Sequence, residues 1–204
     1  MKYVPLFITL LLLLQISCTH KLLKPQPDSK IFIDTLIKST LDKPFSFPHD
    51  WLGYWSGKLN IYNSAGLSDQ ITMALDISKT DSIGLYNWTI IYGTDSTAQR
   101  REYQLKEIDS QIGHYLIDEK NGILIDAFLI QNELNSIFEV MGNTLIISYA
   151  LKNSELQFTV KVFPSKEKRI SGDIEYETQE IPTVKSFELK SVQTAKLYKK
   201  CLVE

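Results

Sequence analysis

The sequence predicts an all-β protein: a roughly ten-stranded antiparallel up-and-down barrel with a short N-terminal helix. From Trp51 onward, apolar and polar residues alternate with a period of two, which is typical of strands with one buried face. Turn-forming residues separate these runs at short intervals. No βαβ rhythm interrupts them, which disfavours a parallel doubly wound sheet.

Residues 1–17 are predicted to be a signal peptide. Lys2 precedes a thirteen-residue apolar run, residues 4–16, and this is shorter than the roughly 20 residues that span a bilayer. The run ends at Ser17-Cys18, which resembles the lipobox of bacterial lipoproteins, although Gln15 stands where a leucine is preferred. The resemblance implies lipidation at Cys18, which then becomes the N-terminus, and plain secretion is the alternative.

Residues 18–50 are expected to form a lipid-anchored tether and a short helix. The stretch 19–30 is rich in lysine and proline, as in a spacer. Apolar residues then recur with rough helical spacing, with Ser29 as a candidate N-cap and Pro44 as a stop. We expect a helix over about 30–42 that closes one mouth of the following domain.

Residues 51–204 are expected to form one barrel domain. The alternating runs cover residues 51–61, 71–77, 84–92, 101–109, 113–119, 123–130, 136–141, 144–151, 155–163 and about 183–192. The longer gap between them, 164–182, is charged and is expected to be exposed. Open sheet edges invite aggregation, and consecutive hairpins favour closure as an up-and-down barrel over a Greek-key sandwich.

The start of the first run carries a family resemblance. Gly53-Tyr54-Trp55 resembles the Gly-x-Trp motif of the calycin superfamily, which includes lipocalins and fatty-acid-binding proteins. The resemblance implies that Gly53 and Trp55 lie where the first strand enters the barrel and that the indole closes the base. It also implies a basic residue stacked on that indole, for which Lys185 or Lys190 are candidates.

The hairpin around Asn121-Gly122 contains the candidate polar ligand contacts. A two-residue turn there would pair Tyr115 with Phe128 and place Asp126 on the same face. An unpaired buried carboxylate is costly, so Asp126 would need a partner. The functional interpretation is that Tyr115 and Asp126 hold the polar end of a ligand; the alternatives are an outward Asp126 or a structural hydrogen bond.

Tyr86, Trp88 and Tyr92 share one face of the run 84–92. Aromatic residues at a period of two form a wall suited to a flat or acyl ligand, and they also simply fill small barrels. Both interpretations remain open from the sequence alone.

Composition excludes several function classes. The 22 basic and 24 acidic residues give a net charge of −2, without the basic excess of a nucleic-acid-binding protein. The two cysteines exclude a Cys₄ metal site. We found no motif for nucleophilic, metal-dependent or phosphate-binding catalysis, so no cofactor, metal or catalytic residue is predicted.

The sequence therefore predicts a monomeric envelope lipoprotein, facing the periplasm or the cell exterior, whose barrel binds a small apolar or amphipathic molecule without transforming it. One alternative is a structural or interaction protein of the envelope that presents loops to a protein partner. A second is a barrel enzyme that uses Asp126 and Tyr115.

Overall fold

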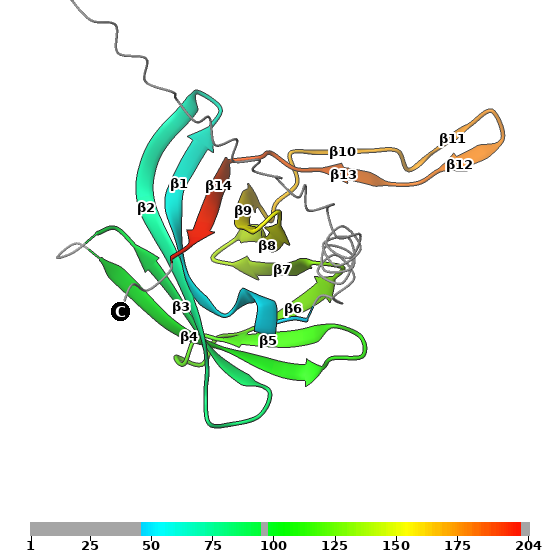
Figure 1. Cartoon of the computed structure of the whole chain (residues 1–204). Coiled ribbons are helices and arrows are strands. Elements are labelled where there is room, and N and C mark those ends of the chain that lie inside the picture. The colour runs from blue at the N-terminus through cyan, green and yellow to red at the C-terminus, as the bar shows by residue number, and fades with distance from the viewer. Residues whose placement is uncertain (1–45, 95–97, 201–204) are drawn as a thin grey trace, which may run out of the picture. The chain divides into compact units, whose positions relative to one another are not determined.

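The computed structural model describes residues 46–94 and 98–200, and within them ten strands close into an antiparallel barrel (Figure 1). The barrel strands are β1 (Gly53–Asn63), β2 (Gly66–Lys79), β3 (Leu85–Tyr92), β4 (Gln99–Asp109), β5 (His114–Asp118), β6 (Leu124–Ile130), β7 (Glu133–Val140), β8 (Asn143–Lys152), β9 (Glu155–Pro164) and β14 (Ser191–Lys199). Their order around the barrel is β1-β14-β9-β8-β7-β6-β5-β4-β3-β2. The predicted fold class, a ten-stranded up-and-down barrel, is confirmed.

The period-two pattern separates the inner and outer faces of each strand. In β2, Met73, Leu75 and Ile77 point inward and are at most 1% exposed. Each such side chain contributes roughly 1.5–3 kcal/mol by leaving water. The alternation in the sequence therefore reflects one continuous apolar interior.

The tenth barrel strand lies later in the chain than predicted. The run 183–192 was expected to close the barrel, but β14 closes it between β9 and β1. Val184, Phe187 and Leu189 supply the apolar alternation of the expected strand, yet they are 53%, 43% and 54% exposed. In β14 the inward positions include Gln193 and Ala195, so the true strand has a weak apolar signal.

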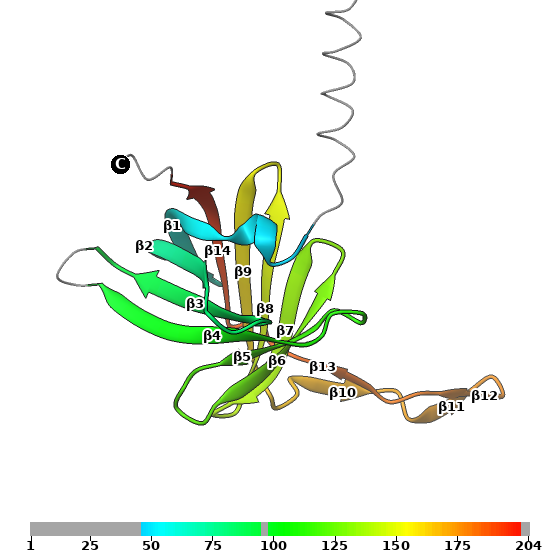
Figure 2. The same cartoon turned by 60° about the horizontal axis from the view of Figure 1, so that its bottom comes forward.

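The segment 165–190 forms a protruding hairpin, here called the arm. Its strands are β10 (Arg169–Ser171), β11 (Ile174–Tyr176), β12 (Gln179–Ile181) and β13 (Val184–Ser186), paired as β10-β13 and β11-β12. The arm leaves the barrel between β9 and β14 and extends away from it (Figures 1 and 2). The sequence predicted that 164–182 is an exposed, charged connection, but it did not predict that this segment pairs into a hairpin.

One end of the barrel is closed by the turn that precedes β1. The 3₁₀ helix η1 (His49–Trp51) places Trp51 at the base with no exposed surface. Trp55 donates its indole N–H to the Trp51 carbonyl oxygen at 2.7 Å, and Phe47 packs edge to face on Trp51 at 4.8 Å. The predicted helix over 30–42 lies outside the described residues, and η1 is the helical element within them.

The cation over the Trp55 indole is Lys199, not Lys185 or Lys190, which lie in the arm. Its Nζ atom is 5.3 Å from the ring centroid. At Gly53 the backbone has a φ of +120°, and an added Cβ would lie 2.8 Å from Lys199 Cε. The backbone conformation favours glycine there, whereas the flexible end of Lys199 could move away from an added Cβ.

Candidate ligand-binding cavity

The barrel interior contains a cavity of about 710 Å³. Its walls come from all ten barrel strands and from the turn between β5 and β6, and most of the lining side chains are aliphatic or aromatic. Ligand cavities commonly measure roughly 300–1,000 Å³ and carry few polar groups. The space is therefore large enough for a small organic molecule.

The aromatic wall of β3 faces this interior. Trp88 and Tyr92 line the cavity together with Ile90. Tyr86, the fourth inward residue of this strand, is 7% exposed and packs near His49 at the closed end, outside the cavity lining. Two of the three predicted aromatic contacts therefore border the space, and the third supports its base.

The deep part of the cavity is an aromatic cluster. The Trp88 and Tyr149 rings meet edge to face with their centroids 5.2 Å apart, and Phe158 lies 4.9 Å from Tyr149. Burial raises the pKa of the Tyr149 hydroxyl well above its usual value, and Tyr92 adds to the rise. This hydroxyl stays neutral at ordinary pH and presents a polar atom without charge.

The predicted face of the β5–β6 hairpin is wrong by one residue. Tyr115 pairs with Ala127, and Asp126 pairs with Leu116. The Glu119 N–H donates to the Ile123 carbonyl oxygen, which closes a three-residue loop in place of the expected two-residue turn. Because side chains alternate along a strand, this shift moves Asp126 and Phe128 to the opposite face from Tyr115.

Asp126 and Phe128 consequently lie on the outer wall of the barrel and do not contact the cavity. The Asp126 carboxylate accepts a hydrogen bond from His114 Nε2 at 2.7 Å, and the side chain of Asp126 is 63% exposed. Phe128 stacks on the His114 ring at 4.8 Å. The partner of Asp126 is therefore His114, rather than Tyr115, Arg100 or Arg101.

Tyr115 points inward but belongs to the closed end of the barrel. Its ring packs edge to face on Phe47 at 4.8 Å, and the residue is 2% exposed. Burial, with smaller contributions from Glu107 and Tyr86, raises the pKa of Tyr115 to about 12. An enzyme site that joins Asp126 and Tyr115 is excluded because the two side chains lie on opposite sides of the wall.

A polar group borders the cavity at the end opposite to Trp55, here called the polar mouth and formed by Arg101, Tyr103 and Glu119. The Arg101 guanidinium carbon lies 5.2 Å from the centroid of the Tyr92 ring. Burial raises the pKa of Tyr103; Glu119 also raises it, whereas Arg101 lowers it. Both charged side chains therefore act on the same phenol.

The inward position of Arg101 was not predicted from the sequence. The signal that would have found it is the alternation Gln99, Arg101, Tyr103, Leu105, in register with the aromatic wall of β3. Arg101 pairs with Ile90, and Tyr103 pairs with Trp88. Residues two positions apart in a strand point to the same face, so a charged residue at the end of an alternating run points inward when the buried residues that follow it do.

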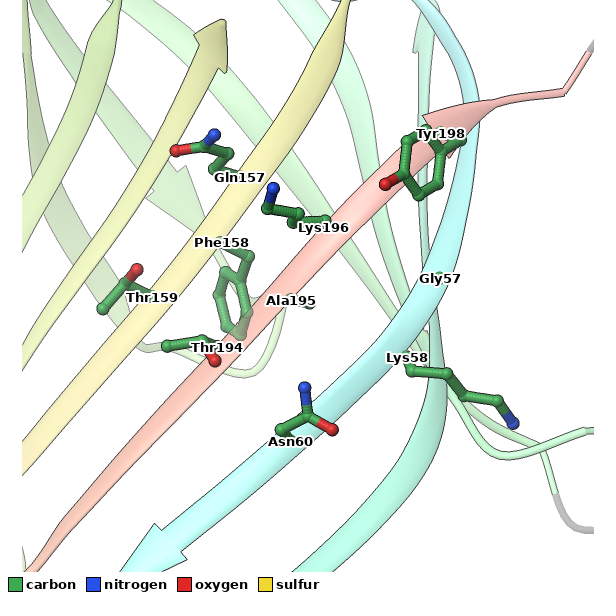
Figure 3. Close-up of a pocket in the computed structure, with 10 residues that line it drawn as sticks. All are labelled: Gly57, Lys58, Asn60, Gln157, Phe158, Thr159, Thr194, Ala195, Lys196 and Tyr198. Atoms are coloured by element: carbon green, nitrogen blue, oxygen red, sulfur yellow. The ribbon is translucent and has the colours of Figure 1, made fainter. Parts of the chain in front are cut away.

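A second depression lies on the outside of the barrel, across β9, β14 and β1 (Figure 3). Lys58, Lys196 and Tyr198 are among the outward side chains that line it. It is a surface groove, separated from the cavity by the barrel wall.

Within residues 46–94 and 98–200, no group of three or more histidine, cysteine, aspartate or glutamate residues is arranged to hold a metal ion. In the same ranges, no helix has the length and apolar character that crossing a membrane requires.

Comparison with known proteins identifies the fold. No protein-family model and no curated protein matches the chain. A protein of unknown function of the DUF3598 family from Nostoc punctiforme aligns with a TM-score of 0.51 and 13% identity, over 78% of this chain and 51% of its own length. The S-type phycobiliprotein lyase of Guillardia theta aligns with a TM-score of 0.52 and 5% identity, over 79% of this chain and 97% of its own.

The chain thus spans about half the length of the DUF3598 protein and nearly the whole lyase. At such low identities the likeness concerns the fold alone. The chain shares with these two proteins the fold of a lipocalin-like antiparallel β-barrel.

Proposed function

We propose that the protein is a cell-envelope lipoprotein whose barrel binds one small hydrophobic or amphipathic molecule and does not transform it. The observation that carries this proposal is the cavity of about 710 Å³ with its predominantly apolar lining. An apolar ligand that fills such a space gains roughly 25 cal/mol for each Å² of apolar surface removed from water.

The distribution of polarity favours an amphipathic ligand. The deep end is formed by Trp88, Tyr149 and Phe158, and the polar mouth lies at the other end. An apolar body would occupy the aromatic cluster, and a polar or anionic group would lie beside Arg101.

The comparison with a phycobiliprotein lyase suggests one chemical class to test. A bilin is a flat, extended molecule with carboxylate groups, and it combines the apolar and anionic character that this cavity accommodates. We therefore include biliverdin as a probe beside a fluorescent fatty-acid analogue.

The binding experiment uses the intrinsic fluorescence of Trp88, which lies in the cavity wall. We expect a saturable change on titration of the full chain, in detergent, with at least one of the two probes. Ser136→Phe should abolish it, since Ser136 is 9% exposed and lines the cavity. Asn135→Phe, the adjacent change on the outer face of β7, should preserve it, with circular dichroism reporting whether each variant is folded.

Native mass spectrometry of the protein from its own host tests the same proposal without a chosen probe. A bound molecule that is recovered with unchanged mass after incubation supports carriage without chemistry. Failure of both probes to bind, together with protein that is always recovered empty, would contradict the proposal.

The lipid anchor is part of the proposal and rests on the leader and Cys18. An anchor at Cys18 would hold the barrel outside the cytoplasm, on the periplasmic or the external side of the envelope. When cells are grown with radioactive palmitate, the wild type and Cys201→Ala should incorporate the label, whereas Cys18→Ala should not. If Cys18→Ala still carried the label, lipidation at Cys18 would be contradicted, and the ligand-binding proposal would be unaffected.

A further inference from the structure

The arm projects from the barrel into solvent. Figure 2 shows it extending from the barrel end opposite to η1, and its two short sheets pair only within the hairpin. At its root, Phe187 contacts Phe163 at 5.6 Å and Lys190 donates to Asn143 at 2.9 Å. A two-stranded hairpin that is solvated on both faces is marginally stable by itself. An extended arm of this kind gains stability when a partner covers it.

The tip of the arm, Gly172–Pro182, is strongly acidic. It contains Asp173, Glu175, Glu177 and Glu180 and has no lysine or arginine. Glu175 and Glu180 are directly opposite each other on β11 and β12. Like charges in this position destabilise a strand pair, so the isolated hairpin contains a repulsion that a cationic partner would relieve.

The other face of the tip is apolar. Ile174 is 59% exposed and Tyr176 is 62% exposed, and Ile181 is opposite Ile174. Exposed apolar side chains next to an acidic face favour insertion into a groove, where both faces of the hairpin contact walls.

The groove on the outer wall has the complementary charge. Lys58 and Lys196 are directly opposite each other on β1 and β14, and the ten residues that line the groove include no acid. Lys196 Nζ is 3.4 Å from Glu155, Lys58 donates to Thr72 at 3.1 Å, and Tyr198 is 52% exposed. The groove has a volume of about 580 Å³ and lies open to solvent (Figure 3). It is here called the lysine groove.

We propose that the protein forms a dimer in which the arm tip of each copy lies in the lysine groove of the other. The glutamate pair of the tip and the lysine pair of the groove have opposite charge, and within its own chain Lys196 is paired with one carboxylate, that of Glu155. The arm begins and ends on β9 and β14, and both strands also form the groove, so a twofold axis beside these strands exchanges the two arms. Electrostatic complementarity selects this partner surface.

Sedimentation velocity of the full chain in detergent tests the exchange. The wild type should be dimeric at micromolar concentration. The double variants E175K/E180K and K58E/K196E should each weaken dimerisation by about tenfold or more. The variant with all four changes restores opposite charges and should recover dimerisation. The control E102K/E139K, which changes the net charge by the same amount as E175K/E180K but elsewhere, should dimerise like the wild type.

Disulfide trapping provides a second measurement that does not depend on charge. In a background with Cys201→Ser, the pair Glu180→Cys and Lys196→Cys should form a covalent dimer on oxidation, whereas Ile83→Cys with Lys196→Cys should not. A monomeric wild type, unchanged dimerisation of either charge variant, or no rescue by the four changes would overturn the proposal. It does not depend on the cavity, so its failure leaves the ligand-binding proposal unaffected.

Discussion

Lys199 on β14 is directly opposite Trp55 on β1, and its Nζ atom lies 5.3 Å from the centroid of the indole. The same indole donates its N–H to the carbonyl oxygen of Trp51 at 2.7 Å. One aromatic side chain therefore joins three parts of the closed end: η1, the first barrel strand and the last.

The Trp55 contacts should contribute unequally to stability. Trp55→Phe removes the buried hydrogen bond, leaves the Trp51 carbonyl without this donor and shrinks a side chain that is 2% exposed. We expect the free energy of unfolding to fall by about 2 kcal/mol. Lys199→Ala should cost less than about 1 kcal/mol because the ammonium is exposed to solvent. Urea denaturation measures both, and equal losses would argue against this assignment.

Arg101 should control the affinity for the charged end of a ligand. We expect Arg101→Leu to weaken binding of a carboxylate-headed amphiphile by about tenfold, or roughly 1.4 kcal/mol, and to leave binding of its methyl ester nearly unchanged. The matched control is Glu102→Leu, the neighbouring position on the outer face. Fluorescence titration distinguishes the two cases, and an equal effect on acid and ester would show that Arg101 does not contact the head group.

Asp126 should be irrelevant to binding. Asp126→Asn keeps the side-chain shape and removes the carboxylate that pairs with His114 on the outer wall. Because the carboxylate is largely exposed, we expect the free energy of unfolding to change by less than about 1 kcal/mol. Ligand titration should give the wild-type affinity. A large loss of affinity would mean that the outer wall contributes to the site.

Tyr115 makes stability fall at high pH. Its pKa is raised to about 12 in the folded protein from 10.0 in the unfolded chain, because burial disfavours the phenolate. Between about pH 10 and 12 the unfolded state releases this proton first, so the contribution of Tyr115 is complete below pH 10 and is lost as the pH rises towards 12. Denaturation at several pH values, compared with Tyr115→Phe, isolates this slope. An identical decline in the variant would assign it to other groups.

The fold followed from local chemistry because barrel strands are half buried along most of their length. Met73, Leu75 and Ile77 give a clear period of two, and the sheet then determines which neighbours they meet. The alternation fails where inward residues are polar or small. Gln193 and Ala195 weaken the apolar alternation of β14, so this strand was not predicted. The exposed Val184 and Leu189 at the root of the arm give an apolar alternation that is typical of a barrel strand, although they are not in one.

The candidate site was harder to predict because it depends on register. The Asn121 side chain accepts from the Ile123 N–H, and the Asp118 side chain accepts from the Lys120 N–H. These two hydrogen bonds stabilise the three-residue loop. The presence of an Asn-Gly pair in the sequence does not determine whether they form, so it does not fix the length of the loop. A shift of one residue was enough to exchange Phe128 for Ala127 as the partner of Tyr115 and to move Asp126 to the outer face.

The pairing of β1 with β14 also constrains how the chain acquires its structure. The first barrel strand pairs with the last, and some 130 residues of chain separate the two. While the ribosome has yet to release residues 191–199, β1 is paired only with β2 and β9 only with β8, and each lacks its second neighbour. The barrel therefore completes only after synthesis of the whole domain. Up to that point the nascent chain remains an open sheet with two unpaired strand edges.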